Sequence, residues 1–378
     1  MSRAATFAFL LVLAMWSGAP VDGRGQVWPF EVTDLSARER LVILVFGDGG
    51  TGAAGQARVG HAMAATCRDR RCDLAIMLGD NLYEDGVEVR IRDDAEASYR
   101  EIIDQFELKF ARPYRGLAEL PGFHVWAVAG NHDYEAHAAG AQIAYSEFSS
   151  LWRMPAQYYT VPRLPPWIQL QAIHTDTSER RDLNGLQVAA VRRALCAEGP
   201  ARWKLAFGHH PVYNSGHHRN DGDERRTRAL VEPVFRACGV HVYFAGHAHH
   251  QEHLTAPGFE QVIQGAAAKS KGSNRPPSSG AVRQRVFRQT FGFAVVEIDA
   301  ERVRMDFYDV LNTREQASSW EPPGADEVVR SYSWCATRDE VGRADREPTP
   351  CPTGGVRGGG PGGYLGMRLR SGANRPAR

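Results

Sequence analysis

The sequence shows no excess of either charge and no unusual composition. Its 378 residues include 45 lysines and arginines against 44 acidic residues, which gives a formal net charge of +1. A dedicated nucleic-acid-binding protein would show a strong basic bias, so this function class is disfavoured. Hydrophobic residues make up 43% and charged residues 24% of the chain, which excludes a disordered chain, a collagen-like fibre and a polytopic membrane protein.

Several short motifs are also absent. No two cysteines follow the C-x-x-C spacing, so the sequence indicates neither a zinc ribbon nor a redox motif. The hydrolase signatures G-x-S-x-G and H-E-x-x-H do not occur, and the chain has no internal repeat. The six cysteines are even in number, which in an exported protein suggests disulfides. Pairing neighbours along the chain predicts the bonds Cys67–Cys72, Cys196–Cys238 and Cys335–Cys351, although the sequence leaves other pairings open.

The first residues have the layout of a secretory signal peptide. A basic start at Arg3 precedes an apolar run from Ala4 to Trp16, and small residues follow at Ser17-Gly18-Ala19. The apolar run is too short to span a bilayer comfortably. A lipoprotein anchor would need a cysteine near the cleavage site, and there is none. We therefore predict a signal peptide over residues 1–19 and a secreted or periplasmic protein. An uncleaved anchor and a buried first helix are the alternatives.

The composition changes again at Cys351. The remaining segment is rich in glycine and arginine and contains no acidic residue. Such a segment cannot bury enough apolar surface to offset its ordering entropy. We therefore predict a mobile tail over residues 351–378, with one main domain over residues 20–350.

The middle of the chain alternates short apolar runs with helical patterns, which predicts an α/β fold with ligands at the carboxyl ends of its strands. The expected strands are Leu41–Phe46, Leu74–Leu78, Phe123–Ala129, Trp203–Phe207 and Val240–Ala245, followed by Gly258–Gln264 and a hairpin of Phe291–Asp299 and Arg302–Tyr308. The expected helices are Tyr99–Ala111, Leu186–Cys196 and Arg226–Cys238. Residues 269–288, basic and rich in Gly, Pro and Ser, are expected to form a loop, either over an anionic substrate or simply at the surface.

Each of the first five runs ends in a polar cluster. These clusters are Gly47-Asp48, Gly79-Asp80-Asn81, Gly130-Asn131-His132-Asp133, Gly208-His209-His210 and Gly246-His247-Ala248-His249. Nine of the fourteen histidines lie between His209 and His253. Carboxylates, an amide and imidazoles without thiolate suit iron, manganese or zinc. They are too many for one ion, so we expect two ions about 3.5–4 Å apart that share a carboxylate.

This ordered series resembles the calcineurin-like metallophosphoesterase superfamily, whose motifs are GD, GD, GNH, GH and GHxH. Tyr83, three residues after Asp80, resembles the tyrosine of purple acid phosphatases, and the similarity is greatest to the small, tartrate-resistant type. The resemblance covers roughly residues 40 to 310 and departs from the family at Gly49 and Ala248. It implies two packed mixed β-sheets flanked by helices, a four-layer sandwich, in a catalytic domain over residues 20–350.

The resemblance also implies roles for individual residues. A first metal, Fe(III), would be held by Asp48, Asp80, Tyr83 and His249, and a second, Fe(II), Zn or Mn, by Asp80, Asn131, His209 and His247. Asp80 would bridge the two ions. His132 and His218 would face the substrate phosphate, with His217 as a rival for the second role. The implied protein is a secreted acid phosphatase that hydrolyses small phosphomonoesters by in-line attack of metal-bound hydroxide, without nucleic-acid partners or stable membrane insertion.

Other functions fit parts of the sequence. A phosphodiesterase or nucleotidase of the same superfamily would use two divalent ions and leave Tyr83 as a packing residue. Gly47, Gly49 and Gly52 fit the G-x-G-x-x-G fingerprint of dinucleotide-binding oxidoreductases. That interpretation places Asp48 beside a pyrophosphate and leaves the histidines unexplained. A binding module that lost catalysis is disfavoured because no expected ligand is missing.

Overall fold

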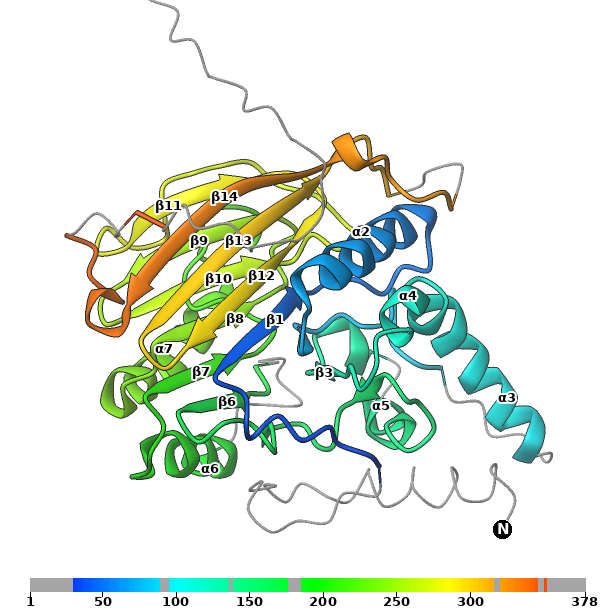
Figure 1. The fold of residues 1–378 in the computed structure, drawn as a ribbon, viewed down its shortest axis with the longest axis horizontal. Helices are drawn as coiled ribbons and strands as arrows, with labels where there is room; N and C mark the ends of the chain where they lie inside the picture. Colours follow the sequence, from blue (N-terminus) through cyan, green and yellow to red (C-terminus); the bar gives the residue numbers. More distant parts are fainter. Residues whose placement is uncertain are drawn as a thin grey trace, which may run out of the picture.

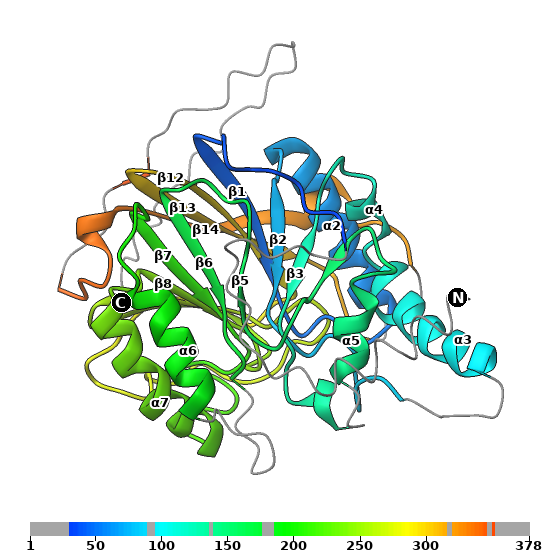
Figure 2. The ribbon, with the colours of Figure 1, turned by 90° about the horizontal axis from the view of Figure 1, so that it is seen from below.

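A computed structural model describes residues 30–88, 95–135, 139–175, 185–315, 320–345 and 350–351. Two seven-stranded mixed sheets pack against each other, with helices on both outer faces (Figures 1 and 2). This confirms the four-layer architecture expected from the sequence. The predicted signal peptide and the predicted tail beyond Cys351 lie outside the described residues.

The first sheet has the strand order β14-β13-β12-β1-β2-β3-β4. Strands β1 to β4 run parallel to one another, whereas β12, β13 and β14 are antiparallel to their neighbours. The strands are β1 (Arg40–Phe46), β2 (Leu74–Met77), β3 (Val125–Ala127), β4 (Trp152–Arg153), β12 (Gly292–Asp299), β13 (Arg302–Val310) and β14 (Val328–Thr337).

The second sheet has the order β11-β9-β10-β8-β7-β6-β5. Its central strands β6, β7, β8 and β10 are parallel, and β5, β9 and β11 are antiparallel additions. The strands are β5 (Tyr159–Thr160), β6 (Ile168–Ala172), β7 (Trp203–Phe207), β8 (Val242–Ala245), β9 (Gln251–Ala256), β10 (Phe259–Gln264) and β11 (Arg283–Arg288).

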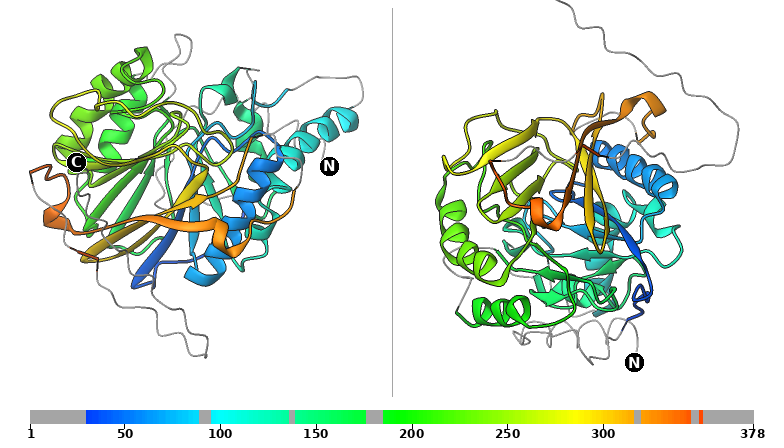
Figure 3. Two further views of the ribbon diagram at one scale, coloured as in Figure 1. Left: turned by 90° about the horizontal axis from the view of Figure 1, so that it is seen from above. Right: turned by 60° about the vertical axis from the view of Figure 1, so that its left-hand side comes forward.

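Helices cover the two outer faces of the sandwich. Figure 3 shows α6 and α7, in green, on one side and the blue and cyan helices on the other. The α-helices are α2 (Ala54–Arg70), α3 (Ala95–Phe106), α4 (Arg115–Ala118), α5 (Ala139–Tyr145), α6 (Gly185–Cys196) and α7 (Gly222–Cys238), and a π-helical turn at Glu107–Ala111 continues α3. Short 3₁₀ turns form at His132–Tyr134, Ala325–Glu327 and Arg338–Glu340.

Strand β1 shows how the layers share the apolar residues. Its side chains at 41, 43 and 45 pack between the two sheets, and those at 42, 44 and 46 pack under the first group of helices. Burial on both faces explains why this strand is a continuous apolar run and not an alternating one. A third apolar cluster lies between the second sheet and helices α6 and α7.

Most expected elements form within a few residues of their predicted bounds. Strand β7 matches at both ends, and helix α7 begins four residues early because the Asp221 side chain accepts a hydrogen bond from the Glu224 N–H and caps the helix. The three predicted disulfides are confirmed. The part of the chain that the structure describes contains no helix long and apolar enough to span a bilayer.

One prediction about the fold is wrong. The sequence predicted a loop throughout 269–288, but Arg283–Arg288 forms β11 at the edge of the second sheet. This strand is recognised only through its partner β9, because its own side chains are half-buried and mostly basic or amidic. Helix α2 was not expected, since about half of its 17 residues are small and its ten buried positions form no clear apolar stripe.

Candidate metal centre

The five polar clusters converge where the carboxyl ends of strands from both sheets meet. Asp48, Asp80 and Asn131 follow β1, β2 and β3 of the first sheet, and His209 and His247 follow β7 and β8 of the second. Hydrogen bonds join the two sheets here. The His209 ring Nδ1 lies 2.7 Å from the Leu78 carbonyl oxygen, and the His247 N–H donates to Asp48 Oδ2 over 2.8 Å. The loops thus form one site, although the sequence separates them by about 200 residues.

Tyr83 is the centre of the first group of predicted ligands. Its phenol oxygen lies 2.8 Å from Asp80 Oδ2 and 3.0 Å from Asp48 Oδ1. His249 Nε2 lies 3.2 Å from the same oxygen. A phenol donates one hydrogen bond, so it cannot satisfy both carboxylates at once. Two carboxylates and an imidazole around one phenol oxygen form a set of donors suited to a cation.

Asn131 is the centre of the second group. Its Oδ1 atom lies 3.1 Å from His209 Nε2 and 3.1 Å from His247 Nδ1. Since the Leu78 carbonyl can only accept, His209 carries a proton on Nδ1, and Nε2 is the nitrogen left to hold either a metal ion or a second proton. A neutral His209 would turn its Nε2 lone pair toward the Asn131 oxygen in a buried site, so this contact requires a cation or a second proton between them.

Asp80 belongs to both groups. Oδ2 contacts Tyr83 in the first, and Oδ1 lies 3.3 Å from His209 Nε2 in the second. A carboxylate with one oxygen toward each group is the bridge that a two-metal site requires. The residues present therefore fit two metal ions, and the assignment of each residue to one ion stays a prediction.

Electrostatics in the protein without metal supports the same conclusion. Burial, followed by the nearby Asp48 and Asp80 carboxylates, raises the pKa of Tyr83 well above its ordinary value. Burial alone would lower the pKa of His209, but the Asp80 carboxylate outweighs it and raises that pKa to about 10. A proton thus takes the place of a cation beside Asp80, and metal binding must release it.

The motif glycines are required because the ligands approach their backbone. A Cβ atom on Gly130 would lie 2.2 Å from Asp80 Oδ1, and one on Gly246 would lie 2.5 Å from Asp48 Oδ2. Asp48, Asp80 and His247 adopt left-handed backbone conformations with φ of 56°, 50° and 65°. Such strain costs on the order of 1–3 kcal/mol per residue and is typical of functional sites.

Asp133 supports the site, and sequence analysis assigned it no role. Its buried carboxylate accepts hydrogen bonds from the N–H groups of Asn81, Leu82 and Gly130, at 2.8 to 3.0 Å, and from the side chain of Gln142 at 2.8 Å. It therefore fixes the loop after β2 against the loop after β3. The position of Asp133 two residues after Asn131, at a strand end, was the sequence signal that could have identified it as part of the site.

The predicted substrate-facing histidines flank the two groups. The His132 ring lies 4.8 Å from the Tyr83 ring, and its Nδ1 lies 2.5 Å from the Glu84 carbonyl oxygen. The His218 ring lies 4.1 Å from the His247 ring, and its Nδ1 lies 3.0 Å from Asp221 Oδ2.

The rival histidine lies nearby as well. The His217 ring is 4.0 Å from the His218 ring and 6.2 Å from the His249 ring. The structure thus brings both neighbours to the site, His218 beside the second group and His217 toward the first. Asp221, which orients His218, was not singled out from the sequence.

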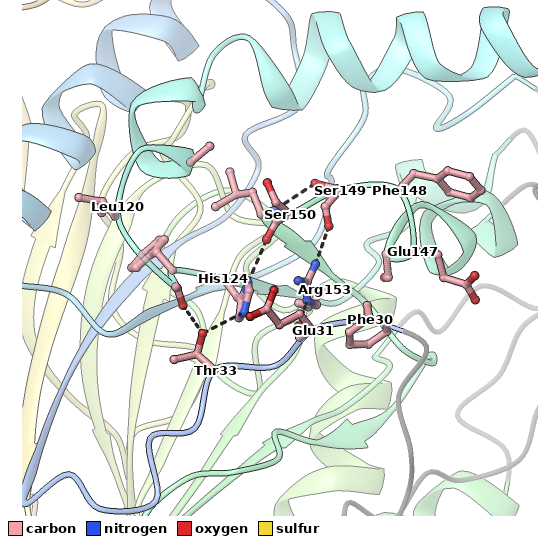
Figure 4. Close-up of a pocket in the computed structure, with 15 residues that line it drawn as sticks. Phe30, Glu31, Thr33, Leu120, His124, Glu147, Phe148, Ser149, Ser150 and Arg153 are labelled. Carbon is pink, nitrogen blue, oxygen red and sulfur yellow. Dashed lines mark hydrogen bonds between the residues drawn. The ribbon is translucent and has the colours of Figure 1, made fainter. Parts of the chain in front are cut away.

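A separate hollow of about 480 Å³ lies at the opposite edge of the first sheet (Figure 4). Phe123 and Leu151, which precede β3 and β4, line it, so it is at the amino ends of these strands. None of the predicted ligands lines it. Its polar side chains His124 and Arg153 donate to backbone carbonyls or lie within reach of them. Its size alone therefore does not identify the functional site.

Comparisons with known proteins agree with this geometry. A family model described as calcineurin-like phosphoesterase matches residues 41–251. Purple acid phosphatase 17 of Arabidopsis thaliana is 23% identical over 328 residues, which cover 81% of this chain and 92% of that protein. Tartrate-resistant acid phosphatase type 5 of Mus musculus is 28% identical over 224 residues, which cover 54% of this chain and 63% of that protein.

Solved structures share the fold at low sequence identity. The purple acid phosphatase PPD1 from yellow lupin seeds superposes with a TM-score of 0.56 at 14% identity, over 85% of this chain and 58% of that chain. GAP50, the anchor in the inner membrane complex of Plasmodium, superposes with a TM-score of 0.61 at 16% identity, over 76% and 90%. At such identities the similarity shows the fold alone.

Proposed function

Because the chain belongs to the calcineurin-like phosphoesterase family, we propose that it is an exported acid phosphatase that hydrolyses small phosphomonoesters at a two-metal centre. The family and the two ligand groups support a metal-dependent phosphatase. The finer assignment depends on one observation: the Tyr83 phenol oxygen lies among Asp48, Asp80 and His249. The relatives whose names include acid phosphatase support the same assignment.

The donor sets favour different ions. Asp48, Asp80, Tyr83 and His249 would hold Fe(III), because a phenolate and two carboxylates are hard anionic donors. Asp80, Asn131, His209 and His247, with only one anionic oxygen donor, would hold Fe(II), Zn or Mn. When bound, the two ions would supply the positive charge that activates water and neutralises the phosphoryl oxygens.

Two histidines would act on the substrate. His218 Nδ1 lies 3.0 Å from Asp221 Oδ2, so Asp221 fixes the orientation of the ring. Nε2 of His218 is then the atom that holds a proton for the phosphate or the leaving group. His132 donates through Nδ1 to the Glu84 carbonyl, which leaves its Nε2 for the same purpose. General acid help of this kind is worth about 10²–10⁴-fold in rate.

The visible absorption spectrum of the iron-loaded, mildly oxidised protein tests this proposal. A purple band from phenolate-to-ferric charge transfer should be present, and Tyr83→Phe should abolish it. Tyr114→Phe is the matched control, because this buried tyrosine donates to the Gly49 carbonyl over 2.9 Å and contacts no predicted ligand. An iron-containing wild-type protein without the band would make Tyr83 a packing residue and favour a divalent-metal phosphodiesterase or nucleotidase.

A kinetic assay distinguishes a phosphomonoesterase from a phosphodiesterase or nucleotidase. We expect p-nitrophenyl phosphate to be hydrolysed faster than bis(p-nitrophenyl) phosphate, and faster at pH 5 than at pH 7. Preference for the diester at neutral pH would overturn the monoesterase proposal while leaving the two-metal centre in place.

A further inference from the structure

The segment after β10 is held tightly against the metal centre. The Ala267 N–H donates to the Gly47 carbonyl over 3.2 Å, directly before Asp48. The Lys271 N–H donates to the carbonyl of His249 over 2.9 Å. Lys269 lies between these two anchors, so its position relative to the predicted ligands is fixed by the backbone on both sides.

The Lys269 side chain lies over the face of Tyr83. Its ammonium nitrogen is 3.6 Å from the centroid of the Tyr83 ring. The same nitrogen is 3.0 Å and 3.1 Å from the two carboxylate oxygens of Glu84, the next residue in the chain. The lysine side chain is 14% exposed, whereas that of Glu84 is 63% exposed. The largely exposed Glu84 carboxylate thus holds the nearly buried Lys269 ammonium group against the Tyr83 ring.

We propose that Lys269 tunes the electron density of the Tyr83 phenolate and, through it, the ferric ion. This inference rests on the proposed function, since it requires iron at the Tyr83 group. A cation over an aromatic face is attracted to its π electrons, and the attraction grows when the ring carries negative charge. Glu84 does not cancel this effect, because its exposed carboxylate is screened by water while the ammonium contacts the ring.

The direction of the effect follows from charge. Phenolate-to-ferric charge transfer moves one electron from the ring to the metal, so the ring is more negative before absorption than after it. Lys269 stabilises the initial state more than the final one and therefore raises the transition energy. One-electron reduction of Fe(III) to Fe(II) lowers the positive charge at the centre, and a nearby cation favours the reduced form.

Lys269→Met tests the proposal. This variant removes the charge and keeps an unbranched apolar side chain over the ring. In the iron-loaded protein we expect its visible band to move to longer wavelength. We also expect the ferric form to be favoured at least tenfold more than in the wild type, about 59 mV for a one-electron couple.

Two further variants make the test specific. Lys269→Arg keeps a cation that can stack on the ring and should restore both wild-type values. Lys271→Met removes an exposed lysine two residues away, whose backbone N–H makes the contact to His249, and should change neither value.

The outcomes distinguish this proposal from the one it rests on. A wild-type protein that contains iron but has no visible band contradicts the proposed function. A wild-type band that is unchanged in Lys269→Met, in both wavelength and potential, overturns the tuning role alone. Equal shifts in Lys269→Met and Lys271→Met would also overturn it, since they would reflect general surface charge.

Discussion

Histidines in and directly after the turn between β8 and β9 differ in what surrounds them. His249 Nε2, at the metal centre, lies 3.2 Å from the Tyr83 phenol oxygen and 3.4 Å from Asp48 Oδ1. His250 Nε2, the next residue, lies 3.1 Å from the fully buried Glu252. His253 contacts Glu260 at 3.0 Å and the Tyr332 hydroxyl at 2.9 Å.

The difference shows what makes a histidine a ligand candidate. His250 and His253 meet carboxylates and a hydroxyl inside the second sheet, where hydrogen bonds alone account for the contacts. His209 has its Nδ1 proton on the Leu78 carbonyl, so its contact with the Asn131 amide oxygen through Nε2 requires a metal ion or a second proton. The position of a histidine in the sequence therefore does not show whether it can bind a metal. The atom that each ring nitrogen faces is the better criterion.

The largest expected effect is the loss of Asp80, which belongs to both ligand groups. Asp80→Ala should lose metal from both positions together with activity, measured as metal content per chain and as hydrolysis of p-nitrophenyl phosphate. Glu260→Gln, at the buried partner of His253, is the control that should retain its metals. A fully active, metal-loaded Asp80→Ala protein would refute the bridging role.

Loss of His132 should affect turnover but not metal content. The ring lies beside Tyr83 and is not among the predicted ligands, so His132→Ala should keep both metals while kcat falls by about 10²–10⁴-fold. His61→Ala, on helix α2, is a control for histidine removal away from the site. Normal kcat in His132→Ala would move the role to another group, such as His218.

His124, which lines the hollow at the opposite edge of the first sheet, should make the metal-free protein less stable in acid. Burial, and then the positive charge of Arg153, lowers the pKa of His124 from 6.5 to about 4. The unfolded chain therefore binds the proton more readily, and this contribution to stability is present above pH 6.5 and is lost as the pH falls to 4. The expected loss is about 2–3 kcal/mol.

Thermal unfolding of the metal-free protein at pH 4 to 7 measures this effect. His124→Gln, which does not titrate, should reduce the slope of stability against pH in this range. An unchanged slope would mean that other groups, such as His241 with its similarly lowered pKa, account for the acid sensitivity.

The smallest effect is expected for the histidine of β9. His253→Ala should leave Glu260 without one of its buried partners and lower the free energy of unfolding by about 1–3 kcal/mol. Metal content and kcat should stay at wild-type values. His249→Ala provides the contrast, since it should lose metal from the Tyr83 group. Loss of metal from His253→Ala would remove the distinction between the two kinds of histidine.

Sequence patterns predicted much of the fold because buried parallel strands are continuous apolar runs. Trp203–Phe207 was predicted at both ends for this reason. Helix α2 gave no such signal, since Gly55 and Gly60 pack against backbone carbonyls and about half of its other residues are small. Strand β11 was not predicted because it is recognised by its pairing with β9, which the sequence of β11 alone does not show.

The sequence by itself determined the types of the candidate ligands, their order and their places after five strands, because each motif is local to the end of one strand. Only the tertiary structure decided which ligands share a group, since that depends on two sheets meeting at their carboxyl edges. It alone showed that Asp133 braces two loops, that Asp221 orients His218 and that Lys269 covers Tyr83. A local sequence pattern cannot show which distant residue a side chain contacts, because folding alone brings the two together.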